Sequence, residues 1–188
     1  MAPTPPTADA TNPVDAAAVL AEWQAREAFL RDRMRDCGVI RPDQAAGKTG
    51  LQMFEAMLTG ELPYPPMAQT LDFLLVEAGA GRAVFQGRPL QRHYNPMGSV
   101  HGGWFATLLD SALGCAVQST LAAGRGYTTA ELKVNIVRPL SDKIPMVRAE
   151  ASVIHLGRRM ATADARMTGP DGKLSAHASI TCFLFDTP

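Results

Sequence analysis

The segment from Gly102 to Ala122 consists mainly of apolar and small residues, and Asp110 is its one charged residue. Its length and composition predict one long buried helix, which Gly124 and Gly126 terminate. We expect apolar side chains on every helical face around the carboxylate: Trp104, Phe105, Leu108, Leu109, Leu113 and Val117. An ionised carboxylate there loses hydration that apolar neighbours cannot replace, and the helix interior holds no Lys, Arg or His to pair with it. Asp110 is therefore predicted to be paired from elsewhere, bound to a ligand or used chemically.

Two predicted strands precede this helix and four follow it, with glycine-containing turns between several of them. The expected strands are Thr70–Glu77, Arg82–Gly87, Thr128–Val137, Met146–Leu156, Arg159–Met167 and Leu174–Phe185. This order predicts an α+β fold in which an antiparallel β-sheet wraps around one long central helix.

The chain before these strands divides into a tail and a helical extension. Four prolines in residues 1–13 predict a disordered tail, and Asn12-Pro13 predicts the start of a helix that Gly38 ends. Its apolar side is expected to hold Val14, Leu20, Trp23, Leu30 and Met34, and its solvated side Arg26, Glu27, Arg31, Arg33 and Asp36. A second helix is expected at Leu51–Leu58 and ends at Gly60. We thus predict a tail (1–13), an N-terminal helical extension (14–66) and one main domain (67–188).

Composition excludes several classes of function. Eighteen basic and 18 acidic residues balance, which argues against nucleic acid or an anionic membrane as a partner. The three scattered cysteines form no metal-binding pattern and predict reduced thiols, with Cys115 and Cys182 buried. The chain shows no secretory signal and no membrane-spanning run, so a cytoplasmic location is expected. Gly47-Lys48-Thr49 is no phosphate loop, because Pro42 stands where the first glycine is required.

The residues N-P-M-G-S-V-H-G-G-W-F-A-T-L-L-D at the start of the long helix, with a later strand ending V-R-P, resemble the hotdog-fold acyl-CoA thioesterases. The closest group is the phenylacetate-pathway (PaaI-like) type, and the likeness covers about Leu58–Phe185. It implies homodimers, usually paired into homotetramers, that hydrolyse an acyl-CoA to a free carboxylic acid and CoA without metal or cofactor. The resemblance does not identify the acyl group.

The resemblance also implies roles for single residues. Asn95 matches a polar residue that helps to bind the thioester region or water, and Gly102 matches the residue whose N–H contacts the thioester oxygen. Asp110 matches the catalytic carboxylate. Thr129 matches a Ser or Thr that orients water, with Thr128 as an alternative because the preceding connection varies in length.

These roles agree with elementary chemistry. Thioester hydrolysis builds negative charge on the carbonyl oxygen, and the first amides of a helix are free donors at the positive end of its dipole. Gly102 offers such an amide without a Cβ, although a tight turn could require the glycines for shape alone. Asp110 could activate water as a general base or attack the carbonyl as a nucleophile; its alternative role is to hold backbone amides.

The remaining histidines and arginines have weaker signals. His101 could act as a base, but a His before two glycines at a helix start can equally cap amides or orient the loop. His93, His155 and His177 are expected to be structural or exposed. Arg158, Arg159 and Arg138 are candidates for the CoA phosphates, with ordinary solvated surface arginines as the alternative.

Two other functions remain in view, a non-catalytic acyl-CoA-binding or scaffold protein and a hotdog enoyl-CoA hydratase. A mere binder gains nothing from burying a carboxylate, and the loop between Asn95 and His101 lacks the Asp expected of a hydratase.

Gly102 and Asp110 are eight residues apart, so about 12 Å of helix separates their backbones. One active site therefore has to be assembled from two subunits, with Gly102 of one beside Asp110 of the other. Small residues at Ala112, Gly114 and Ala116 are expected to permit close approach around the helix.

Overall fold

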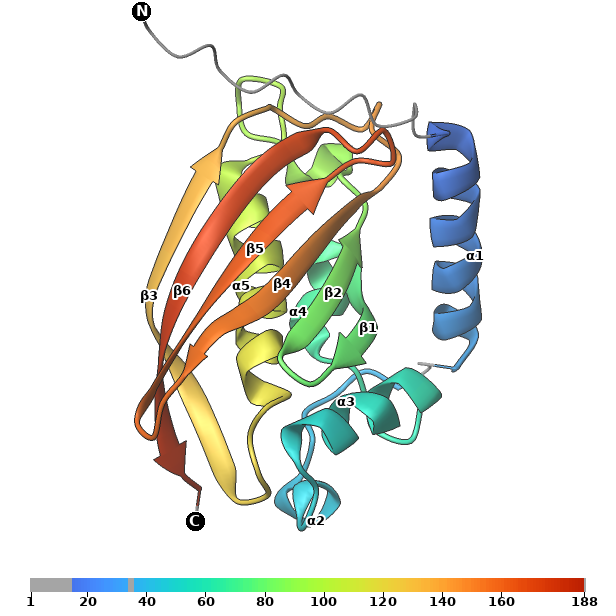
Figure 1. Ribbon diagram of the computed structural model, residues 1–188. Helices are drawn as coiled ribbons and strands as arrows, with labels where there is room; N and C mark the ends of the chain where they lie inside the picture. Colours follow the sequence, from blue (N-terminus) through green and yellow to red (C-terminus); the bar gives the residue numbers. More distant parts are fainter. Residues whose placement is uncertain (1–14, 34–35, 188) are drawn as a thin grey trace, which may run out of the picture.

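The computed structural model describes residues 15–33 and 36–187. A six-stranded sheet wraps around the long helix α5, and the other helices lie beside it (Figure 1). The helical elements are α1 (Ala16–Arg33), α2 (Pro42–Ala45), α3 (Gly50–Thr59), α4 (Pro66–Leu71), the 3₁₀ turn η1 (Gln91–His93) and α5 (Gly102–Gln118). The strands are β1 (Phe73–Gly79), β2 (Arg82–Gly87), β3 (Arg125–Ile136), β4 (Val147–Leu156), β5 (Met160–Thr168) and β6 (Leu174–Asp186).

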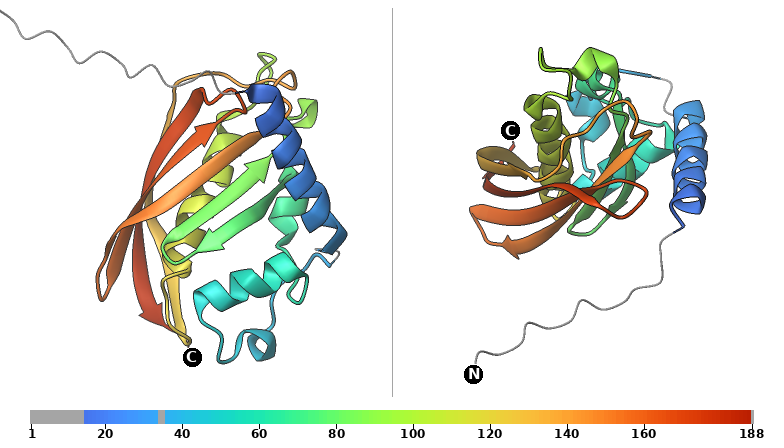
Figure 2. Two further views of the ribbon diagram at one scale, coloured as in Figure 1. Left: turned by 45° about the vertical axis from the view of Figure 1, so that its right-hand side comes forward. Right: turned by 90° about the horizontal axis from the view of Figure 1, so that it is seen from above.

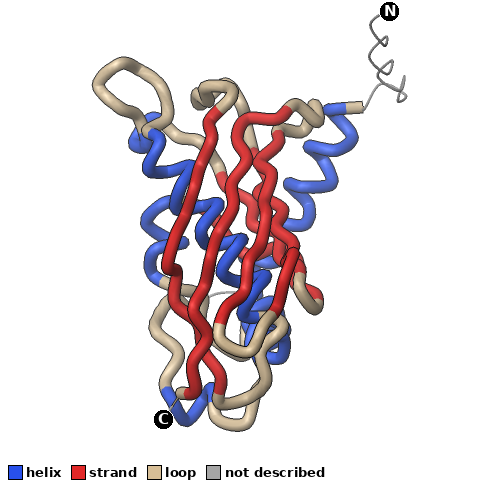
Figure 3. Tube along the Cα trace, turned by 60° about the vertical axis from the view of Figure 1, so that its left-hand side comes forward, coloured by secondary structure: helices blue, strands red, loops and turns tan. Residues whose placement is uncertain are grey.

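The strands are ordered β1-β2-β4-β5-β6-β3, and all neighbouring pairs are antiparallel. Figure 3 shows the outer face of this sheet, with α5 behind it. The predicted order of two strands, one long helix and four strands is confirmed, and so is the wrapped α+β architecture. The strand expected from Thr70 begins later, at Phe73. Residues Pro66–Leu71 instead form α4, because Pro66 suits a first helical position and Asp72 ends the helix in the left-handed region (φ 53°).

The core lies between α5 and the inner face of the sheet. Along β5 every second residue is buried against the core. The buried residues are Ala161, Ala163, Ala165 and Met167. Such small side chains bring the sheet close to α5. Gly114 allows the closest approach, because a Cβ at this position would overlap the hydroxyl of Tyr127.

This packing corrects one expectation. Ala112, Gly114 and Ala116 are all buried within their own subunit, so the close approach that Gly114 permits is to Tyr127 of its own sheet and not to a second subunit.

Helix α1 lies beside the β1–β2 hairpin (Figure 2). The predicted tail and the predicted helix start at Asn12-Pro13 lie outside the described residues. The described helix begins at Ala16, and the Asp15 carboxylate accepts the N–H groups of Ala17 and Ala18.

Helix α3 forms where it was expected, and Gly60 ends it in the left-handed conformation (φ 82°). No helix in the described part of the chain has the length and hydrophobicity needed to cross a membrane.

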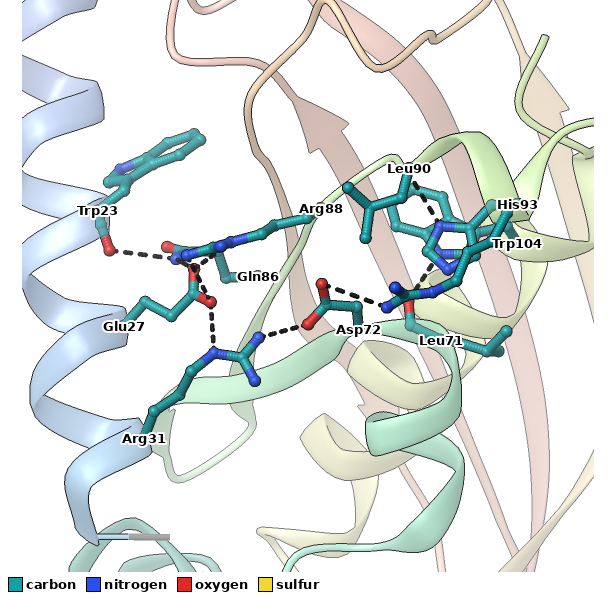
Figure 4. A network of polar contacts seen from close by, with 11 residues as sticks. Trp23, Glu27, Arg31, Leu71, Asp72, Gln86, Arg88, Leu90, His93 and Trp104 are labelled. Carbon is teal, nitrogen blue, oxygen red and sulfur yellow. Dashed lines mark hydrogen bonds and ion pairs between the residues drawn. The ribbon is translucent and has the colours of Figure 1, made fainter. Parts of the chain in front are cut away.

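Glu27 on α1 was predicted to be solvated, and this was wrong: the residue is only 1% exposed. Its carboxylate accepts hydrogen bonds from Arg31 (2.5 Å), Gln86 (3.1 Å) and Arg88 (3.3 Å), as Figure 4 shows. Gln86 is itself fully buried and also donates to the carbonyl of Trp23. The charge is tolerated because both carboxylate oxygens have donors.

Replacing Glu27 with Ala should lower the free energy of unfolding by about 1–3 kcal/mol, because one of the two Gln86 amide hydrogens stays buried without its acceptor and the half-exposed Arg88 loses its ion-pair partner. Denaturant unfolding monitored by circular dichroism measures the change. Glu22→Ala is the matched control, since Glu22 is an exposed glutamate on the same helix. Equal small losses in both variants would show that the network does not hold α1 in place.

Candidate active site

Asp110 lies in the middle of α5, but it is not enclosed by apolar residues on every face. The six predicted apolar neighbours are buried, whereas one face of the helix stays open. Small and polar residues make up this face, which we call the open face of α5: Gly103, Ala106, Thr107, Asp110 and Ser111. The carboxylate is therefore partly buried and still accessible from one side.

One hydrogen bond holds the Asp110 side chain. The Thr129 hydroxyl donates to Asp110 Oδ1 over 3.2 Å. A β-bulge follows Thr129 in the pairing of β3 with β6, and bulges commonly re-aim side chains beside functional sites. The structure thus brings Thr129 to Asp110; no hydrogen bond joins Thr128 to it.

Burial raises the pKa of Asp110 above its ordinary value, and the Thr129 hydrogen bond offsets part of this change by favouring the ionised form. No charged side chain of the described residues contributes to the shift. A carboxylate with a raised pKa and no cationic partner is a stronger base than an exposed aspartate, which suits proton abstraction from water.

Thr129→Val should raise the pKa of Asp110 further, because it removes the donor that stabilises the ionised carboxylate. If Asp110 must be ionised for turnover, the acidic limb of kcat/KM against pH moves to higher pH. Thr128→Val, a neighbouring exposed threonine, is the control and should leave the limb in place. If kcat/KM depends on pH in the same way in both variants, Thr129 does not influence the ionisation of the catalytic group.

The amino terminus of α5 presents one unused amide. His101 is the N-cap, and its Nδ1 accepts the N–H of Gly103 over 2.8 Å. Within the described residues, no group accepts a hydrogen bond from the Gly102 N–H. The geometry therefore gives His101 a capping role and leaves Gly102 as the free donor at the positive end of the helix dipole.

Asn95 organises the loop before this helix. Its side-chain oxygen accepts the N–H groups of Met97 (2.9 Å) and Ser99 (3.3 Å), and its amide nitrogen donates to the Ser99 hydroxyl (3.1 Å). The backbone adds a hydrogen bond from the Asn95 N–H to the Ser99 carbonyl (2.8 Å). In a single subunit Asn95 thus shapes the loop that leads to His101 and Gly102.

His93 supports the same helix start, which agrees with the expectation that it is structural or exposed. It is buried, its ring stacks on Trp104 at 5.5 Å, and its carbonyl accepts the His101 N–H over 2.8 Å. The preceding residue, Arg92, pairs with Asp72, which also binds Arg31 of α1 (Figure 4). No local pattern could have indicated this support, because its members come from three distant segments.

The predicted arginines lie at the two ends of the domain. Arg158 and Arg159 are exposed on the β4–β5 turn, at the opposite end of the sheet from the amino terminus of α5 (Figure 1). Arg138 is exposed two residues after the end of β3 and two residues before Leu140, whose carbonyl accepts the Val100 N–H beside the start of α5. Within one subunit, Arg158 and Arg159 therefore do not lie at the same site as Arg138 and the start of α5. His155 and His177 are exposed, as predicted.

Comparison with known proteins identifies the family of this chain. Residues 97–176, which include His101, Gly102, Asp110 and Thr129, match the family model of the thioesterase superfamily. A Caenorhabditis elegans protein named as an esterase is 32% identical over 119 residues, covering 62% of this chain and 69% of the relative. The chain spans between 53% and 69% of the length of each curated relative that it matches.

Two solved structures have the same fold. A phenylacetic acid degradation-related protein from Ralstonia eutropha, named as a thioesterase, is 30% identical with a TM-score of 0.63, covering 69% of this chain and 98% of that chain. A variant of the phenylacetic acid degradation protein PaaI from Thermus thermophilus is 28% identical with a TM-score of 0.57, covering 63% and 97%.

An antiparallel sheet wrapped around a long central helix is thus the fold of the hotdog thioesterases, and this chain belongs to the thioesterase superfamily. Within that superfamily it is of the PaaI type, as its matches to phenylacetic acid degradation proteins show.

Proposed function

We propose that this protein is an acyl-CoA thioesterase, which hydrolyses the thioester to a free carboxylic acid and CoA. The observation that carries the proposal is Asp110, an accessible carboxylate with a raised pKa that accepts a hydrogen bond from Thr129. It lies on a helix whose first amide, that of Gly102, has no acceptor in the described residues.

In the proposed reaction the Gly102 amide donates to the thioester oxygen and stabilises the negative charge that develops there. Asp110 takes a proton from water, which attacks the carbonyl carbon, and the carbon–sulfur bond then breaks to release the CoA thiolate. A direct attack by Asp110 uses the same carboxylate and forms an anhydride that water hydrolyses. Single turnover in ¹⁸O-labelled water separates these two routes, because only direct attack by Asp110 can leave ¹⁸O in the Asp110 carboxylate.

The proposal requires two subunits. About 12 Å of helix separates the backbones of Gly102 and Asp110, whereas reacting groups must approach within about 3–3.5 Å. Two surfaces are available for a second copy: the open face of α5 and the edge strand β3, whose outer side pairs with no other described strand. Long uncovered edge strands favour pairing with another chain. An antiparallel homodimer then sets Gly102 of one subunit beside Asp110 of the other.

The same symmetry accounts for the arginines. Turning the domain end over end brings the β4–β5 turn of one subunit towards the α5 amino terminus of the other, so that Arg158 and Arg159 flank a site with Arg138. We propose that these side chains bind the phosphates of CoA, for which the planar guanidinium is well suited.

Arg158→Ala combined with Arg159→Ala should raise KM for an acyl-CoA and spare hydrolysis of the corresponding acyl-pantetheine, which lacks the nucleotide phosphates. Steady-state kinetics with both substrates measure the difference. Arg33→Ala, an exposed arginine of α1 at the β1 edge of the sheet and away from β3, is the control. Equal losses on both substrates would assign the two arginines to structure.

A hydrolysis screen tests the proposed function directly. Purified protein is incubated with short, medium, long and aromatic acyl-CoAs, and thiol release is followed with a chromogenic reagent. We expect turnover of at least one class, abolished in Asp110→Asn. Binding of acyl-CoA without hydrolysis of any substrate would favour the alternative, a non-catalytic acyl-CoA-binding protein.

A further inference from the structure

An apolar pocket of about 350 Å³ lies between the helical extension and the core of the domain. Phe54 and Met57 of α3 form one wall, Leu75 of β1 and Phe85 of β2 form another, and Cys115 of α5 lies between them. The rest of the lining comes from the extension: Gly38, Val39, Ile40, Pro63, Pro65 and Pro66. The volume falls within the range of small-molecule sites in proteins, which is about 300–1,000 Å³.

The lining has one chemical character. No charged side chain takes part in it; aliphatic, aromatic, proline and glycine residues surround the single thiol. Burial raises the pKa of Cys115 to about 12, so this thiol is neutral at physiological pH. A buried carboxylate or ammonium group in the pocket would lose its hydration without gaining a partner, whereas a hydrocarbon chain would be favoured by burial.

The pocket lies beside the proposed catalytic carboxylate. Cys115 follows Asp110 by five residues on the same helix, a rise of about 7.5 Å. Asp110 is near enough to add to the rise in the pKa of Cys115. Asp110 and Cys115 thus lie on neighbouring turns of α5, and Tyr127 of β3 is near both of them.

The extension supplies most of this pocket. Apart from Cys115, every lining residue precedes residue 97, where the match to the family model begins. Membership of the superfamily therefore does not specify the pocket, which depends on what this chain places before its central helix.

We propose that this pocket binds the acyl part of the substrate, and that it selects uncharged hydrocarbon acyl groups of medium length over acetyl and over carboxylated acyl groups. This inference rests on the proposed thioesterase function and names its substrate class. The helical extension then determines specificity, while Asp110 and Gly102 carry the chemistry.

The test compares kcat/KM for acetyl-, hexanoyl-, decanoyl- and succinyl-CoA. We expect kcat/KM to rise with chain length, by up to about fourfold per methylene that enters the pocket. Succinyl-CoA should be at least about a hundredfold poorer than hexanoyl-CoA, because its carboxylate has no partner in the pocket. A flat profile across the four substrates would overturn the inference while leaving the thioesterase proposal intact.

Val39→Trp provides the structural test, because Val39 lines the pocket yet is 81% exposed, so the larger side chain can partly fill the pocket without disturbing the core. It should lower kcat/KM for decanoyl-CoA at least about tenfold and change that for acetyl-CoA less than about twofold. Met67→Trp, at an exposed position of α4 that does not line the pocket, is the matched control. Equal effects of both substitutions would overturn the inference.

Calorimetry separates this inference from the proposed function. If no acyl-CoA is hydrolysed, the thioesterase proposal fails, but titration with decanoyl-CoA still tests the pocket. Binding weakened at least about tenfold by Val39→Trp, and unchanged by Met67→Trp, supports the pocket. Absence of decanoyl-CoA binding to the unmodified protein overturns it.

Discussion

Asp110→Asn is expected to lower turnover at least about a hundredfold, the low end of what a positioned general base contributes. Asparagine has nearly the shape of aspartate and can still accept the Thr129 hydrogen bond, so the substitution removes charge and basicity and leaves packing in place. Turnover of purified, folded protein with the best substrate of the hydrolysis screen measures the effect.

Stability should not fall with activity. The pKa of Asp110 is raised in the folded protein, so the folded state binds this proton more tightly than the unfolded state. The raised pKa therefore lowers stability as pH rises through the ordinary and then the folded pKa, and asparagine removes that loss. We expect a Tm at pH 7 equal to or above that of the unmodified protein. Ser111→Ala, on the same helix face, is the control; near-normal turnover in Asp110→Asn would exclude Asp110 from the mechanism.

Mixing two inactive variants should restore activity if the site is shared. Gly102→Pro removes the one N–H in question, and the first position of a helix tolerates proline. By itself, the Gly102→Pro variant should have a kcat about 10²–10³-fold lower than that of the unmodified protein, which is the usual effect of deleting one oxyanion donor. A heterodimer of Gly102→Pro and Asp110→Asn subunits holds one doubly altered site and one intact site, so an equimolar mixture should recover about a quarter of normal activity.

Gly102→Ala is the matched control for the proline, because it keeps the N–H and adds a Cβ that lies 3.3 Å from Ile136. It should retain most of its activity. Heterodimers can be verified by two different affinity tags and native mass spectrometry. Verified heterodimers of normally folded subunits that show no activity would contradict the shared site.

Much of this protein follows from local sequence. A long apolar segment with a capping His101 and a following Gly102 predicts where α5 begins, because a cap and helical periodicity depend on residues close in the chain. The alternation of the strands and their glycine turns likewise predicts their order. The spacing of eight residues between Gly102 and Asp110 alone requires a second subunit for the proposed chemistry, because helix rise per residue is constant.

Other features depend on contacts between distant segments. Thr129 rather than Thr128 reaches Asp110 because the pairing of β3 with β6 places a bulge there. Glu27 is buried because Gln86 and Arg88, about sixty residues later, supply its donors.

The sequence by itself thus determined the central helix, the order of the strands and the candidate catalytic residues. Only the tertiary structure decided which face of α5 stays open, which threonine meets the carboxylate and where the apolar pocket lies. Helix and strand formation follows local periodicity and capping, whereas burial and polar pairing depend on side chains that meet only after the chain has folded.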